Sequence, residues 1–183
     1  MVGLEQYRLS GKVMTKLFLV KALYNRWAND RLAADMAKLS PEQLTATCAV
    51  NFGSILAIAN HLVLADRLWL HRFTGQGEPV ASVDAVPYAT LAGLAAARHV
   101  EEDRAIAFVQ KLDPQRLGSV LAYRTTDGTP MALPLALCID HFFNHQTHHR
   151  GQIHGLLGSH GIKAVDIDLL GFERETSAYA NLL

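Results

Sequence analysis

Cysteine is scarce in this sequence, and no long apolar run interrupts it. Among 183 residues there are only two cysteines, Cys48 and Cys138, which lie far apart and outside any CxxC pair. Neither a disulfide framework nor a cysteine-based zinc site is therefore supported. The apolar run LFLV near the N-terminus lies between Lys16 and Lys21 and is too short for a signal sequence or a membrane span. We expect an intracellular, cytoplasmic protein in which any metal chemistry depends on histidine.

The chain also lacks an excess of charge of either sign. Lys plus Arg and Asp plus Glu each number 17, so no net field attracts DNA or an anionic membrane. Half of the residues are hydrophobic and 19% are charged, which is the composition of a folded globular protein. We expect one domain over residues 1–183, with neither nucleic acid nor membrane as a partner.

Apolar residues recur with helical spacing in four long stretches. The predicted helices cover residues 13–39, 52–74, 90–112 and 134 to 158 or 161. Before the last of them, β-branched residues around Asp127-Gly128 predict a small hairpin or an irregular crossover. The sequence therefore predicts an all-α fold, a four-helix bundle with its core at about residues 13–160 and a C-terminal docking tail at residues 162–183.

The last helix contains the stretch HFFNHQTHHRGQIH, which holds five of the nine histidines. His145 and His149 are one turn apart on the same helix face, and Gln152 shares that face. Two imidazoles at this spacing can hold one metal ion, as they do in HExxH zinc sites. Gln152 is placed to hydrogen-bond a metal-bound water or to orient a substrate. Hydrogen-bonded histidines on a solvated face are the alternative.

Three other residues of this helix are not assigned to the site. His141 is expected at the edge of the metal-binding face and His148 further from it, whereas His154 falls on the opposite side, toward solvent. Arg150 also lies off the face and is expected to form a salt bridge or a helix or subunit contact, with binding of a substrate anion as the alternative. The sequence does not fix the roles of His141, His148 and Arg150.

Glutamate is absent from the predicted last helix. The motif HQTHH therefore lacks the glutamate that serves as the general base of HExxH metalloproteases, which disfavours peptidase activity. A dicarboxylate di-iron site is excluded for a similar reason, because it requires Glu-x-x-His on two helices.

A third ligand has to come from another helix, because catalytic zinc sites commonly use three protein ligands. The stretch NHLVLADRLWLHR places His61 on an otherwise apolar stripe of the second predicted helix. A buried imidazole requires a partner for its ring nitrogens, and a metal shared with the histidine helix would be one. A hydrogen-bonded core histidine is the alternative. Asp66 lies off the His61 face and is expected at the surface or in contact with a metal ligand.

These motifs resemble those of the DinB/YfiT-like family of metal-dependent proteins. The matching residues are Asn60-His61, Ala65-Asp66 and Trp69, followed by NHQTHHRGQ at residues 144–152 and by GIKAVDIDLLGF near the end. The resemblance implies a bundle with up-down-down-up topology, a homodimer, and a divalent metal ion held by three histidines, which here map onto His61, His145 and His149. Neutral imidazole suits several metals; we expect zinc or nickel.

The resemblance also suggests what the site does. Some relatives resemble S-transferases or isomerases that use a low-molecular-weight thiol, and others are associated with DNA damage. We therefore expect a metalloenzyme acting on a small molecule, either a thiol-dependent transferase or isomerase or a metal-assisted hydrolase. The alternative is a non-enzymatic, dimeric metal-binding or stress-response protein. The substrate and the catalytic residues are not determined by the sequence.

Overall fold

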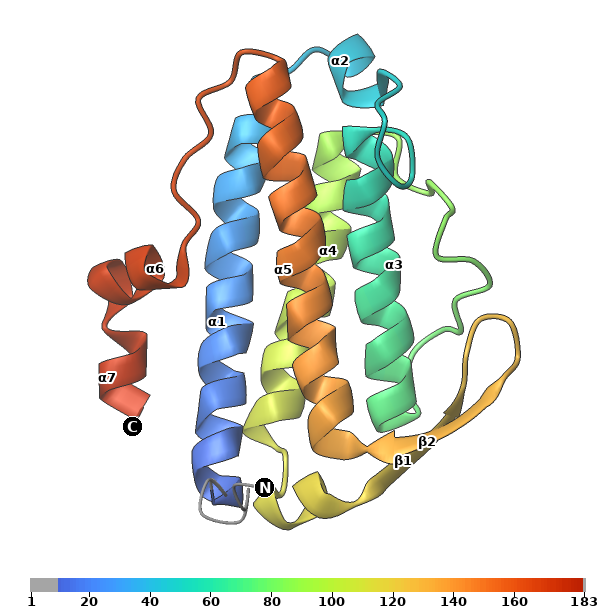
Figure 1. The fold of residues 1–183 in the computed structure, drawn as a ribbon, viewed down its shortest axis with the longest axis vertical. Helices are drawn as coiled ribbons and strands as arrows, with labels where there is room; N and C mark the ends of the chain where they lie inside the picture. Colours follow the sequence, from blue (N-terminus) through green and yellow to red (C-terminus); the bar gives the residue numbers. More distant parts are fainter. Residues whose placement is uncertain (1–9, 183) are drawn as a thin grey trace, which may run out of the picture.

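Four long helices lie side by side in the computed structural model, which describes residues 10–182 (Figure 1). They are α1 (Gly11–Met36), α3 (Ile55–Thr74), α4 (Leu91–Gln110) and α5 (Leu135–Ser159). Helices α1 and α5 run in one direction and α3 and α4 in the other (Figure 1). Both α1 and α3 pack against α4 and against α5. The fold is mostly helical, as the apolar spacing predicts.

Helix α1 ends earlier than the sequence pattern predicts. Ser10 begins it by accepting the N–H of Val13, and Met36 is its last residue, three positions before the predicted end at Leu39. Ser40 then begins an unpredicted short helix, α2 (Pro41–Thr45), with a reciprocal capping box to Gln43. The apolar spacing continues past Met36 to Leu39, so spacing alone did not locate the end of α1.

Helix α3 begins three residues later than predicted. Phe52 and Gly53 have positive φ angles of 70° and 77°, which end any helical path through them. Ser54 follows in extended conformation and accepts the N–H of Ala57, so the helix begins at Ile55.

The segment between α4 and α5 forms the predicted hairpin. A short 3-10 helix, η2 (Pro114–Gly118), leads into β1 (Val120–Arg124) and β2 (Pro130–Pro134). The strands are antiparallel, with Ala122 opposite Ala132, and Gly128 supplies a positive φ of 86° in the turn. Helix α5 follows β2 directly, so the hairpin fixes where the histidine helix begins.

The C-terminal segment docks against α1 and contains α6 (Leu169–Thr176) and α7 (Ala178–Leu182). The ring of Phe172 packs edge-on against Tyr24 and Trp27 of α1 at centroid distances of 5.9 and 5.7 Å. The hydroxyl of Tyr24 donates a hydrogen bond of 2.8 Å to the carbonyl of Ile167. This segment therefore covers one side of α1 and part of α5.

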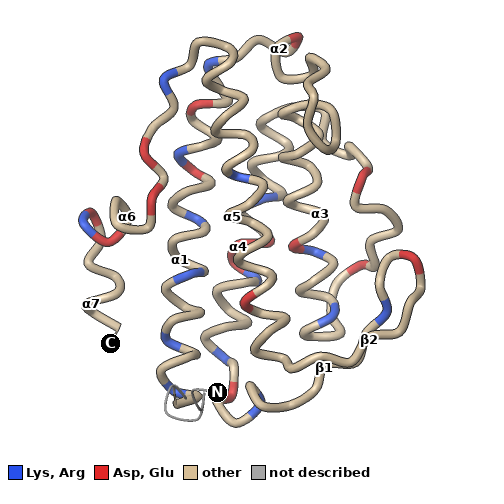
Figure 2. The backbone as a smooth tube through the Cα atoms, in the orientation of Figure 1, with Lys and Arg blue, Asp and Glu red and all other residues tan. Residues whose placement is uncertain are grey.

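Lysine and arginine as well as aspartate and glutamate are spread over the described helices (Figure 2). None of the helices within residues 10–182 combines the length and the apolarity that a membrane crossing needs.

Candidate metal centre

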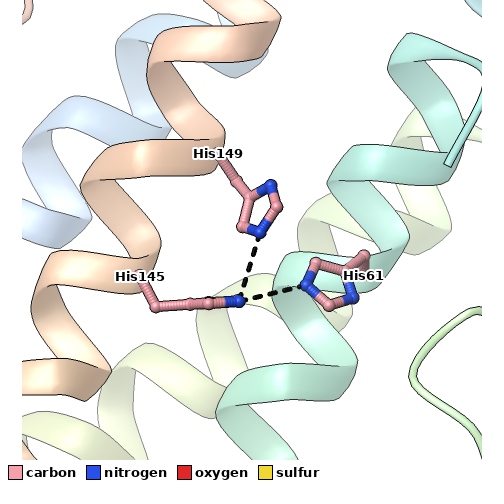
Figure 3. A group of neighbouring side chains, drawn as sticks. All are labelled: His61, His145 and His149. Carbon is pink, nitrogen blue, oxygen red and sulfur yellow. Dashed lines mark hydrogen bonds between the residues drawn. The ribbon is translucent and has the colours of Figure 1, made fainter. Parts of the chain in front are cut away.

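Three histidine rings converge between α3 and α5 (Figure 3). His61 comes from α3, and His145 and His149 come from successive turns of α5. The Nε2 atom of His145 lies 3.2 Å from that of His61 and 3.2 Å from that of His149. The ligating atoms of all three lie within 4.8 Å of one another. The i, i+4 pair of α5 and His61 of α3 thus lie close together in space.

These distances fit a divalent metal ion. In a tetrahedral zinc site with Zn–N bonds of ~2.0–2.1 Å, neighbouring nitrogen ligands are about 3.3 Å apart. The two Nε2 separations at His145 are close to that value. Without a metal, the single proton that a neutral His145 can carry on Nε2 would have to serve both contacts.

The second nitrogen of two rings is held by an acceptor. Nδ1 of His61 lies 3.0 Å from the carbonyl of Val83, and Nδ1 of His149 lies 2.7 Å from Oε1 of Gln152. An oxygen of this kind accepts, so each Nδ1 carries the proton and each Nε2 presents its lone pair. Such contacts fix the orientation of a ligating ring and raise its basicity.

Burial keeps these imidazoles neutral, which is the form that binds metal. Burial, together with the adjacent His149 and His61 rings, lowers the pKa of His145 to about 3. Burial also lowers the pKa of His61 and that of His149, against the hydrogen bonds that these rings donate to Val83 and Gln152, which raise the two pKa values. All three are therefore deprotonated at neutral pH.

Phe52 covers one side of the cluster, a contact that the sequence did not reveal. Its ring stacks on His61 at a centroid distance of 3.9 Å with the planes 23° apart, and it meets His149 edge-on at 5.5 Å. His61 and His149 are each only 5% exposed. The left-handed backbone of Phe52 directs the ring toward the histidines, and no local sequence motif predicts this backbone conformation at a phenylalanine.

The remaining histidines of α5 lie around the cluster as follows. His141 and His148 are exposed, with ring centroids 5.8 Å from His145 and 4.8 Å from His149, respectively. His154 lies on the opposite side of α5, as predicted, but the expectation that it faces solvent was wrong. It is half-buried, with Nε2 3.2 Å from the carbonyl of Val165, because the C-terminal segment covers that side.

Buried polar contacts hold α5 in place next to the histidines. Gln146 is fully buried and donates to the carboxylate of Asp66 on α3, which also pairs with Arg98 on α4. A surface position for Asp66 was therefore wrong, because the side chain is 1% exposed and links three helices. Arg150 is also buried and donates to Asn25 on α1, so it forms the helix contact that was one of its expected roles.

The fold and site define a helical protein with three convergent histidines between two of its long helices. The sequence pattern of the DinB family matches residues 14–181, and the chain belongs to this family. It is 26% identical to the protein DinB of Bacillus subtilis (strain 168) over 156 residues, which are 79% of this chain and 87% of that protein.

A solved structure supports the same fold. The crystal structure of a DinB-like protein from Bacillus cereus ATCC 10987 superposes with a TM-score of 0.56, covering 77% of this chain and 91% of that chain at 19% sequence identity. At this level of identity the likeness concerns the arrangement of helices and carries no information on ligands.

Proposed function

We propose that this protein is a single-domain, DinB-like four-helix bundle of up-down-down-up topology that binds one divalent metal ion through Nε2 of His61, His145 and His149. The observation that carries the proposal is the convergence of three neutral imidazoles at Nε2 separations of 3.2 Å. The hydrogen bonds from Nδ1 of His61 and His149 leave their Nε2 lone pairs directed at the same point. Zinc and nickel both suit three neutral nitrogen ligands.

The reaction we propose is group transfer or isomerisation that uses a low-molecular-weight thiol, with metal-assisted hydrolysis as the second choice. A metal ion with three protein ligands keeps a position for a small molecule and lowers the pKa of a thiol or water bound there. The chain's own part is to hold the three rings in place and to shield one side with Phe52. Small-molecule access is then from the side of the exposed His141 and His148.

A non-enzymatic metal-binding protein, acting in a stress response, is the second candidate. Two observations favour it: His61 and His149 are nearly inaccessible, and Phe52 occupies space next to them. For either candidate we propose a cytoplasmic homodimer. Light scattering of the purified protein tests the dimer, which should have a mass of twice 20.1 kDa.

Elemental analysis of the protein without a histidine tag tests the metal site. Zinc, nickel, iron, copper and manganese are measured in the native protein and in His61→Ala, His145→Ala and His149→Ala. We expect near one equivalent of metal in the native protein and loss of it in each variant. His148→Ala is the matched control, since this ring lies on the same helix and is exposed; it should retain the metal.

Two results would contradict the metal proposal. One is the absence of metal from the native protein even after reconstitution, and the other is loss of metal from His148→Ala with retention in His149→Ala. Circular dichroism of each variant shows whether the helices persist, so that unfolding is not mistaken for loss of a ligand. A metal-loaded protein that consumes no small thiol in the presence of an electrophile would favour the binding protein over the enzyme.

A further inference from the structure

A second candidate site lies at the other end of α3, away from the histidines. A cavity of about 470 Å³ lies where the last turn of α3 meets the end of α4 and η2. Three of its lining residues are cations, namely Arg104, Lys111 and Arg116, and none of the described lining residues is acidic. The volume falls within the range of about 300–1,000 Å³ that is usual for small-molecule sites.

The cations leave an excess of positive charge at this cavity. Arg104 is bound to Glu101, but the same carboxylate also binds Arg67, so one negative charge is shared by two guanidinium groups. Lys111 and Arg116 are exposed, and within residues 10–182 neither forms an ion pair.

Local acids offset only part of this charge. Glu101 is buried beneath Arg67 and Arg104. The carboxylate of Asp113, between Lys111 and Arg116 in the sequence, accepts the N–H of Gln115 at 2.9 Å and begins η2, and within residues 10–182 it forms no ion pair with either cation. Arg104 is also held in place by a hydrogen bond of 3.0 Å to the carbonyl of Gln76. The cavity is therefore lined by one hydrogen-bonded cation, Arg104, and two exposed cations.

The floor of the cavity is aromatic. The rings of Phe73 and Phe108 stack with centroids 5.1 Å apart and planes 7° apart. Phe73 is buried, whereas Phe108 is half-buried, so part of its apolar surface is open to the cavity. Leu70, Ala107 and Leu112 complete the apolar lining. Aromatic surfaces of this kind pack favourably against a planar ligand.

We propose that this cavity binds a small organic anion that combines a planar apolar ring with a carboxylate, sulfonate or phosphate group. The ring would pack on Phe108 and the charged group would lie among Arg104, Lys111 and Arg116. The site is separate from the metal centre, because Phe73 lies about 18 Å further along α3 than His61. It also lies between α3 and α4, whereas the histidines lie between α3 and α5.

Isothermal titration calorimetry with three probes tests the proposal. Naphthalenesulfonate carries both the ring and the charge, naphthalenemethanol carries only the ring, and methanesulfonate carries only the charge. We expect binding of naphthalenesulfonate that weakens as salt rises, with each of the other probes binding about tenfold more weakly or worse. Equal binding of naphthalenesulfonate and naphthalenemethanol would overturn the proposal, because the cations would then contribute nothing.

Variants locate the bound probe. The double variant Lys111→Gln/Arg116→Gln should weaken binding of naphthalenesulfonate about tenfold, and Phe108→Leu should weaken it while keeping an apolar side chain. The matched control, Lys163→Gln/Arg174→Gln, removes two exposed cations of the C-terminal segment and should bind like the native protein.

The same titration separates this site from the metal centre. His149→Ala should bind naphthalenesulfonate as the native protein does, whether or not it holds a metal. Loss of binding in His149→Ala or in the control pair, or full binding in Lys111→Gln/Arg116→Gln, would place the anion elsewhere and overturn the proposal. All of the substituted cations are exposed or at the rim, so each variant is expected to fold, and thermal unfolding checks this.

Discussion

Nε2 of His61 lies 3.2 Å from Nε2 of His145, although 84 residues separate the two in the chain. Neither helix alone brings them together. Helix α3 presents His61 and helix α5 presents His145, and the buried contact of Gln146 with Asp66 joins the same two helices one residue away from His145. The candidate metal centre is thus fixed by the same contacts that hold the helices together.

Gln152 is predicted to tune metal affinity by orienting His149. Gln152→Leu removes the acceptor that lies 2.7 Å from Nδ1 of His149, and loss of such a contact typically costs about 10–100-fold in metal affinity. Gln152→Glu keeps an acceptor and should retain most of the affinity. Competition with a chromophoric chelator measures both. Equal metal affinities in the native protein and Gln152→Leu would show that the hydrogen bond of Gln152 does not support His149 as a metal ligand.

Phe52 is predicted to slow the escape of the metal. Phe52→Gly removes the ring that stacks on His61 and also relieves a non-glycine residue of its positive φ, a strain of about 1–3 kcal/mol. We expect little change in the free energy of unfolding but faster transfer of metal to a chelator. Phe52→Tyr keeps the stacking and should match the native protein. An unchanged transfer rate in Phe52→Gly would show that the ring does not shield the site.

Asp66 is predicted to be essential for stability. Asp66→Leu removes the carboxylate that pairs with Arg98 and accepts from Gln146, and breaking a buried pair on one side typically costs about 3–5 kcal/mol. We expect a loss at the lower end of that range, because Arg98 keeps Glu102 at 3.4 Å and Gln146 keeps the carbonyl of Leu62 at 3.2 Å. Removing both charges in Asp66→Leu/Arg98→Met should recover part of this loss. Urea unfolding of the native protein, both single variants and the double variant gives the coupling energy. A coupling near zero would mean that the pair contributes independently.

Acid is predicted to destabilise the metal-free protein. Because burial lowers the pKa of His145 from 6.5 to about 3, the unfolded chain binds a proton below about pH 6.5 that the folded protein does not accept. The contribution of the neutral His145 to the free energy of unfolding is therefore fully present above pH 6.5 and is lost as the pH falls toward 3. His145→Asn should show a shallower fall. Urea unfolding in chelator at several pH values measures the slopes, and identical slopes would contradict the prediction.

Much of the fold could be predicted because it depends on local properties of the sequence. Apolar spacing predicted the four long helices to within a few residues, and β-branched residues around Asp127-Gly128 predicted a small hairpin or an irregular crossover, of which the structure has the hairpin. The errors fall where backbone geometry overrides spacing. Because of the left-handed turn at Phe52, α3 begins three residues later than predicted. The cap at Ser40 begins a helix of five residues, which is too short to show a helical period of apolar residues. The tail was expected to dock, but its contact with His154 depends on how it lies across α5.

The sequence by itself determined that His145 and His149 share a helix face and that His61 lies on an apolar stripe, because both follow from helical periodicity. Only the tertiary structure decided that the three Nε2 atoms converge, that the Val83 carbonyl and Gln152 hold two of the rings, and that Phe52 covers them. A backbone carbonyl is present in every residue, and a ring's direction depends on its backbone and its neighbours. Contacts between distant segments are therefore settled by how the helices pack and not by spacing within any one of them.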